Sequence, residues 1–169
     1  MRRYRLVVLL VAGLAGLGAL LYEANREMGK VETGENVARV DWLPASARNV
    51  SFYRSYSFTA CEFDIPEQEF LAWAAGEGCA VQRIPAGGKR TVTRYHWYDR
   101  RLTYPADPPE DASFAELQKW AADVERYRAT QYQQIEHGYF YEYRQDDGGG
   151  TTVGYDADAG RAYYQSSPR

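Results

Sequence analysis

Two cysteines, Cys61 and Cys79, carry the most reactive side chains of this 169-residue chain, and no other cysteine is present. The apolar segment at the start of the chain, described below, predicts that they lie in an oxidising compartment, where an even pair of cysteines favours a disulfide. That bond would close a loop of about 18 residues, which stabilises a fold by roughly 3 kcal/mol through the lost entropy of the unfolded chain. Two alternatives stay open: two buried free thiols, or a nucleophilic thiol paired with His96 or His137.

A second group of candidate residues surrounds His96, in the run Thr-Arg-Tyr-His-Trp-Tyr of residues 93–98. Strand alternation would place Arg94, His96 and Tyr98 on one face. A guanidinium group beside aromatic rings is suited to an acidic ligand or a sugar. The candidate ligand-binding residues are therefore Arg94, His96, Trp97 and Tyr98, together with Tyr139 from the aromatic C-terminal part. The simpler interpretation is an exposed sheet face with mixed side chains.

Neither histidine has the spacing of a metal site. His96 and His137 are isolated, without a His-x-x-x-His or Cys-x-x-Cys pattern, so no zinc site is predicted. His137 alternates with hydrophobic and aromatic residues, which predicts a hydrogen-bonded histidine in the core. Residues 156–160 resemble a calcium loop, but the glycine comes one position early and Ser167 stands where a glutamate is required. The sequence therefore predicts neither a metal nor a cofactor.

Four carboxylates, Glu62, Asp64, Glu67 and Glu69, are close in the sequence, and glycoside hydrolysis needs a pair of such groups. Asp64 and Glu67 already have a structural explanation, because acidic residues stabilise the start of a helix whose first turn contains Pro66. A small hydrolase is therefore an alternative function and not the favoured one.

The charge of the chain is uneven along its length. The formal net charge is -3, but residues 31–169 hold 15 Lys and Arg against 21 Asp and Glu. Binding to a nucleic-acid backbone needs clustered Lys and Arg, so no nucleic-acid partner is expected for this acidic part.

Residues 6–21 contain no charged or strongly polar side chain, and Arg2, Arg3 and Arg5 precede them. With one flanking tyrosine at each end, the stretch corresponds to about 28 Å of helix, close to the ~30 Å hydrocarbon thickness of a bilayer. The three arginines place the N-terminus in the cytoplasm by the positive-inside rule. We expect residues 1–22 to be an uncleaved signal anchor that spans the cell membrane once; a cleaved signal peptide is the alternative.

The same apolar segment has small residues four apart, and this spacing allows a homodimer through Ala12 and Gly16. Residues 23–40 are charged and without periodicity, so we expect a juxtamembrane tether. Residues 41–169 would then form one domain in the periplasm or the extracellular space.

Alternation, capping residues and turns predict the elements of this domain. They are a β-rich segment at 50–65, a helix at 66–75, a hairpin of 80–84 with 91–98, a helix opened by the Ser113–Glu116 capping box and ending at 129–133, and a three-strand meander at 135–144, 151–155 and 161–165. Hairpins follow one another without βαβ crossovers. The predicted fold class is therefore α+β: an N-terminal transmembrane helix, then an antiparallel sheet of about five to six strands packed by two helices.

Most polar residues thus have a structural explanation, and no complete catalytic constellation is present. We expect a non-enzymatic, membrane-anchored protein-interaction module that binds an unidentified protein partner. The alternatives are a small periplasmic hydrolase or thiol enzyme, and a sugar-binding module that uses the tyrosines of the C-terminal strands.

Overall fold

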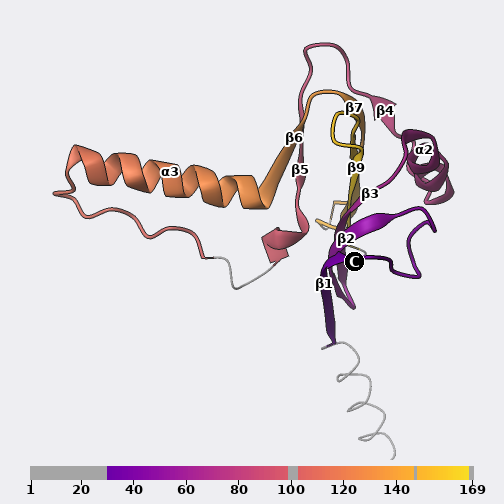
Figure 1. Ribbon diagram of the computed structural model, residues 1–169, viewed down its shortest axis with the longest axis horizontal. Helices are drawn as coiled ribbons and strands as arrows, with labels where there is room; N and C mark the ends of the chain where they lie inside the picture. Colours follow the sequence, from indigo (N-terminus) through magenta and orange to yellow (C-terminus); the bar gives the residue numbers. More distant parts are fainter. Residues whose placement is uncertain (1–29, 99–102, 147, 168–169) are drawn as a thin grey trace, which may run out of the picture.

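The computed structural model describes residues 30–98, 103–146 and 148–167 of the chain (Figure 1). Seven strands form one antiparallel sheet in the order β1-β2-β3-β9-β8-β7-β4, and β5 and β6 form a separate antiparallel ribbon. The helical elements are α2 (Glu67–Gly76), the 3-10 turn η1 (Tyr95–Tyr98) and α3 (Phe114–Gln131). The strands are β1 (Val31–Val37), β2 (Arg48–Ser55), β3 (Phe58–Asp64), β4 (Gln82–Arg83), β5 (Arg90–Thr93), β6 (Tyr132–Ile135), β7 (Gly138–Arg144), β8 (Gly150–Asp156) and β9 (Arg161–Ser167).

The predicted fold class is wrong in two respects. The main sheet has seven strands, not five to six, and a second two-stranded sheet is present. Of the two helices in the described part of the chain, α2 lies against the main sheet, whereas α3 projects away from it as an arm (Figure 1). No helix among the described residues is long and apolar enough to cross a membrane, and the predicted anchor at residues 6–21, with Ala12 and Gly16, lies outside them.

One face of the main sheet is covered by α2. Phe70 of this helix is fully buried and stacks on Tyr155 of β8 with ring centroids 4.6 Å apart. Trp73 meets Phe63 of β3 edge-on, at 5.2 Å between ring centroids. The helix begins where Pro66 and the acidic first turn predict it, and Ala74 on its inner face is also buried. Aromatic burial therefore holds this layer in place.

The opposite face is covered by the β5–β6 ribbon. Val92 of β5 and Ile135 of β6 form a second apolar cluster with Ile84 and Tyr163. Gly154 of β8 allows this close approach, because a Cβ atom there would lie 2.6 Å from Val92 Cγ1 and 2.8 Å from Ile135 Cδ1. The sheet is thus the middle layer, with a helix on one side and a ribbon on the other.

The position of Gly138 explains why the strand predicted at 135–144 is divided into two. Its φ is +147°, and an added Cβ would lie 1.8 Å from the Tyr155 carbonyl oxygen, so only glycine fits. The chain leaves the ribbon at Ile135 and enters the main sheet at Gly138, whereas alternation alone predicts one continuous strand. The rest of the predicted meander is confirmed, because β7, β8 and β9 are neighbours.

The predicted hairpin of 80–84 with 91–98 is wrong. β4 pairs with β7, and β5 pairs with β6. The β-rich segment predicted at 50–65 consists of two strands, because a tight turn at residues 56–57 joins β2 to β3. Residues 31–37 of the predicted tether form β1, which pairs with β2 at one edge of the sheet.

Candidate functional site

The residues proposed as a ligand-binding face do not lie on one face. Arg94 follows β5 and makes two hydrogen bonds to the Glu62 carboxylate, at 2.9 Å from Nε and 2.6 Å from Nη2. His96, Trp97 and Tyr98 belong to η1 and not to a strand. His96 is half-buried beside Tyr95, with ring centroids 3.9 Å apart, and the side chains of Trp97 and Tyr98 lie outside the described part of the structure.

Tyr139, the fifth of these residues, lies on the other face of the main sheet. Its ring packs near Phe70 of α2, with ring centroids 6.4 Å apart. Its hydroxyl donates to Glu67 Oε1 at 2.7 Å, and this hydrogen bond raises the pKa of Tyr139. The structure therefore separates Tyr139 from Arg94 and His96 by the thickness of the sheet, and a single acidic-ligand or sugar face made of these residues is not assembled.

Both cysteines are buried in the core beneath α2, where their thiols are free. Burial raises the pKa of Cys61 far above its ordinary value, with the Glu62 and Glu77 carboxylates adding to the shift. Burial also raises the pKa of Cys79. A thiol that stays protonated at neutral pH is a poor nucleophile, so this environment does not favour a thiol enzyme. The Cys61–Cys79 disulfide stays a prediction, which titration of free thiols before and after reduction of the full-length protein tests.

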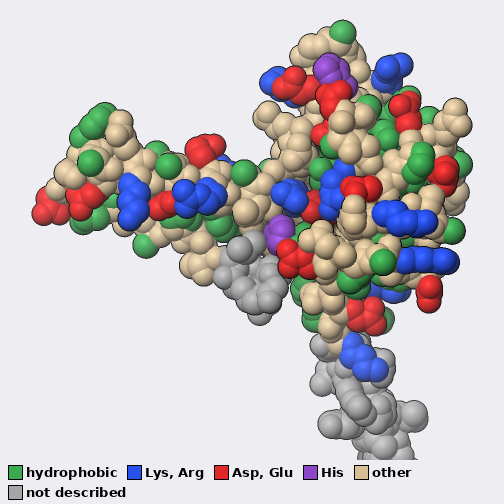
Figure 2. Space-filling view, in the orientation of Figure 1, with side chains coloured by type: hydrophobic (Ala, Val, Ile, Leu, Met, Phe, Trp, Pro, Cys, Tyr) green, Lys and Arg blue, Asp and Glu red, His purple; other side chains and the backbone are tan. Residues whose placement is uncertain are grey.

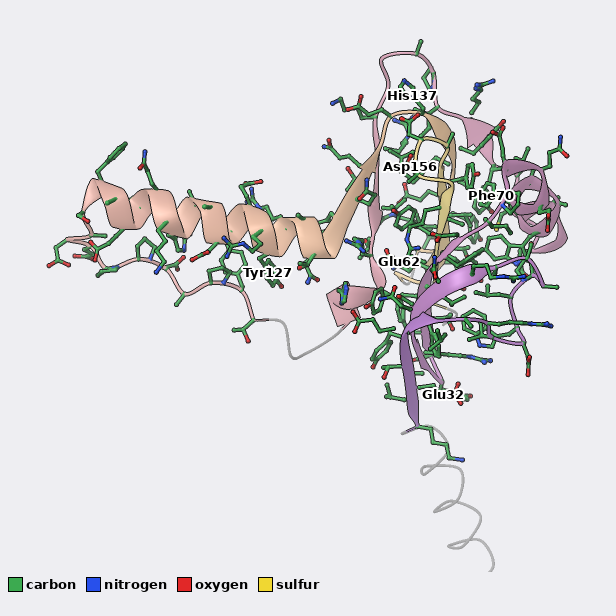
Figure 3. All side chains as sticks on the ribbon, in the orientation of Figure 1. Glu32, Glu62, Phe70, Tyr127, His137 and Asp156 are labelled. Carbon is green, nitrogen blue, oxygen red and sulfur yellow. The ribbon has the colours of Figure 1, made fainter. Side chains whose placement is uncertain are left out.

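His137 is exposed, so its predicted place in the core is wrong. It lies in the turn between β6 and β7, and its Nδ1 is 2.7 Å from Asp158 Oδ2 (Figure 3). The hydrogen bond and charge of Asp158 raise the pKa of His137. A pocket of about 180 Å³ adjoins this pair and is also lined by Glu67, Arg83 and Tyr139. Of the pair, only His137 lines this pocket, and the described lining residues include no serine, threonine or cysteine that could act as a nucleophile.

A buried ion-pair cluster connects the ribbon to the main sheet. The Glu62 side chain is 2% exposed and lies between Arg94 and Arg161, whose Nη2 is 3.4 Å from Glu62 Oε1 (Figure 3). The hydrogen bond to Glu62 raises the pKa of Arg94, and burial raises the pKa of nearby Tyr163 to about 12. Because its members come from β3, β9 and the end of β5, the cluster specifies how the ribbon docks. Sequence reasoning missed it, since Glu62 and Arg94 are 32 residues apart.

A basic groove runs along the far edge of the main sheet, between β7 and the ribbon. Its volume is about 1040 Å³, and Phe140 contributes an aromatic surface. Its four cations, which come from β4, the loop before β5, β5 and β7, are Arg83, Lys89, Arg90 and Arg144. The Arg90 guanidinium lies 5.8 Å from the centre of the Phe140 ring. No sequence motif indicates this groove, because β4 and β7 become neighbours only in the folded sheet.

The α3 arm projects away from the sheet in Figure 1 and carries exposed apolar side chains at its far end. Ser113 and Glu116 form the predicted capping box, and α3 ends at Gln131, as expected. Phe114 is 76% exposed and Leu117 is 43% exposed, whereas Val124, near the base, is buried. The loop of residues 103–113 runs alongside the helix out to the far end of the arm, and Tyr104 meets Tyr127 edge-on at 5.3 Å between ring centroids (Figures 1 and 3).

The far end of the arm is acidic. Residues 103–118 contain four carboxylates and no Lys or Arg. Figure 2 shows these acidic side chains beside exposed hydrophobic ones at the end of the arm, while basic side chains occur closer to the body. The arm therefore presents an apolar stripe with an acidic border.

Comparisons with known proteins give no relative: no protein-family model, no curated protein and no solved structure matches this chain. Within the described residues, no group of three or more His, Cys, Asp or Glu side chains is arranged to hold a metal ion.

Proposed function

We propose that this chain is a membrane-anchored protein-interaction module that binds a protein partner through the α3 arm. The observation that carries the proposal is the projecting helix with Phe114 at 76% and Leu117 at 43% exposure. Exposed apolar side chains at helical spacing are the anchors that a helix uses when it docks into a partner's groove. The partner is expected to present an apolar patch bordered by Lys and Arg, because the end of the arm is acidic.

The anchor at residues 6–21 and the location of residues 41–169 outside the cytoplasm are part of this proposal. They rest on the apolar stretch and its preceding arginines. A domain held at the membrane by its N-terminus would extend α3 away from its own body, where a partner in the same membrane or compartment can reach it.

The test is photo-crosslinking in cells from a light-activated amino acid placed at Leu117 of the full-length protein. Ala122 is the matched control, because it is exposed on a different side of the same helix. We expect one dominant protein adduct from position 117, its loss when Phe114→Asp is added, and no such adduct from position 122. No adduct at position 117, or the same adducts from both positions, would contradict the proposal.

A further inference from the structure

The outer edge of β7 is only partly covered. β8 pairs with β7 along its whole length, from Gly138 to Arg144. On the opposite edge, β4 has two residues, which pair with Tyr139 and Phe140. Among the described strands none pairs with the remaining part of this edge, residues 141–144. An uncovered strand edge offers backbone donors and acceptors to another strand.

The direction of these backbone groups follows from the hydrogen bonds of β4. The Ile84 N–H donates to the Gly138 carbonyl oxygen at 2.9 Å, so the backbone groups of Gly138 point towards the β4 edge. Backbone groups alternate in direction along an antiparallel strand. Those of Glu142 and Arg144 therefore point to the same edge, beyond the end of β4.

This uncovered edge forms one wall of the basic groove. Lys89 pairs with Glu136, and Arg144 pairs with Glu142. No carboxylate of the described residues forms an ion pair with Arg90, whose guanidinium lies over Phe140. Arg83 ends the short β4 strand and lies at the same groove. The edge is therefore positively charged, although residues 31–169 as a whole are acidic.

We propose that this edge of β7 binds an extended acidic peptide segment of a protein partner, added as a further strand of the main sheet. Backbone hydrogen bonds to Glu142 and Arg144 supply the pairing, and alternate side chains of the peptide face opposite sides. On the groove side they meet Arg90, and on the other side they meet Tyr141 and Tyr143. The preferred segment therefore alternates acidic with apolar residues. The α3 arm is not part of this site, so failure of either proposal leaves the other standing.

The experiment is fluorescence anisotropy of the full-length protein with fluorescein-labelled octapeptides. The probe alternates Val and Glu. One comparison peptide alternates Val and Lys, and a second places four Val before four Glu. Two further peptides have the sequence of the probe with N-methyl groups on alternate amides, one on each of the two alternate sets. We expect binding of the probe and no binding of the Val–Lys peptide or the block peptide, which lose the charge or the alternation. Of the two N-methylated peptides, the one methylated on the amides that face β7 should lose binding, because only every second N–H of an added strand bonds to the edge. Equal binding of both N-methylated peptides, equal binding of the block peptide, or no binding of the probe would overturn the proposal.

Two pairs of protein variants separate the charge from the backbone. Arg90→Glu should weaken probe binding at least tenfold, whereas Arg126→Glu on the arm, the same change of charge elsewhere, should leave it unchanged. Glu142→Pro removes an edge N–H and should abolish binding, although it also removes a negative charge. Glu142→Gln removes the charge but keeps the N–H, and should strengthen binding. Unchanged binding by the proline variant would overturn strand addition.

One further outcome would assign the edge to a different occupant. The loop of residues 103–113 is itself acidic, so a second copy could supply the segment. In that case the full-length protein would form a dimer that Arg90→Glu dissociates, and the probe would not bind. This result would overturn the proposal of a separate partner and assign the edge to a second copy of the chain.

Discussion

The main sheet is covered by α2 on one face and by the β5–β6 ribbon on the other, and different interactions hold these two layers in place. Under α2, Phe70 stacks on Tyr155 within a continuous apolar core. Under the ribbon, a smaller apolar cluster lies beside the buried Glu62 carboxylate and its two guanidinium partners. Apolar burial is non-directional, whereas buried ions must be paired with good geometry. The α2 layer is therefore a general source of stability, and the ribbon layer specifies one position for the strands that carry α3.

Removal of the Phe70 ring should have the largest effect on stability. Phe70→Ala would leave a cavity beneath α2, and we expect the free energy of unfolding to fall by about 4 kcal/mol. Urea unfolding of the full-length protein, followed by tryptophan fluorescence, measures this change. Phe114→Ala is the matched control on the exposed arm, and its effect should be within about 0.5 kcal/mol. Similar losses for both variants would contradict the different packing of the two helices.

Removal of the Glu62 carboxylate should have the next largest effect. Glu62→Ala leaves Arg94 without its buried partner, while Arg161 keeps Asp64, and we expect a loss of about 3 kcal/mol. The double variant Glu62→Met with Arg94→Met should lose less, because no unpaired charge remains in the interface. Glu125→Ala, which breaks an exposed pair on α3, is the control and should change stability by less than about 1 kcal/mol. A double variant less stable than Glu62→Ala would show that the pair itself, and not the orphaned charge, dominates.

The contact between the ribbon and the sheet should also be sensitive to one methyl group. In Gly154→Ala the new Cβ would press on Val92 and Ile135, and we expect a loss of about 2 kcal/mol through overpacking. Gly76→Ala at the end of α2 is the matched control, since nothing lies within 4 Å of the new atom. Differential scanning calorimetry of both variants compares the two faces directly, and an unchanged melting temperature for Gly154→Ala would argue against the close packing of the ribbon.

The smallest expected effect concerns the turn between the ribbon and the main sheet. Asp158 raises the pKa of His137 above its ordinary 6.5, so the pair stabilises the folded state fully below about pH 6.5. That contribution is lost as pH rises through the higher folded pKa. Titration of the His137 ring by NMR should give a pKa that falls towards 6.5 in Asp158→Asn, with His96 as a reference in the same spectra. An unchanged His137 pKa in that variant would rule out the pair.

Local elements were predictable where neighbouring residues alone decide them. The capping box of Ser113 and Glu116, the helix start at Pro66 and the alternation of β7 to β9 all depend on interactions within a few residues. The exposure of Phe114 was not predictable, because the apolar stripe of α3 has the spacing of a helix that covers a sheet. The β5–β6 ribbon occupies that face instead.

Local sequence patterns predicted the candidate sites even less well than they predicted the exposed face of α3. The types of Arg94, His96 and Tyr139 indicated binding chemistry, but the structure places Tyr139 on the other face of the sheet from the ion pair of Arg94. The basic groove carries no motif, since Arg144 is far from Arg83 and Arg90 in the chain and joins them only through the pairing of β4 with β7. Residue type indicates which chemistry a side chain can take part in, whereas strand pairing determines which other side chains lie beside it.

The sequence by itself determined the helices, most strands, their turns and the expectation of a membrane anchor, because these follow from local spacing and composition. Only the tertiary structure decided which strands pair, that the chain crosses from ribbon to main sheet at Gly138, and that an arm and an uncovered strand edge remain. Pairing partners are chosen by the best burial available across the whole chain, and that choice joins residues such as Glu62 and Arg94 that local patterns cannot connect.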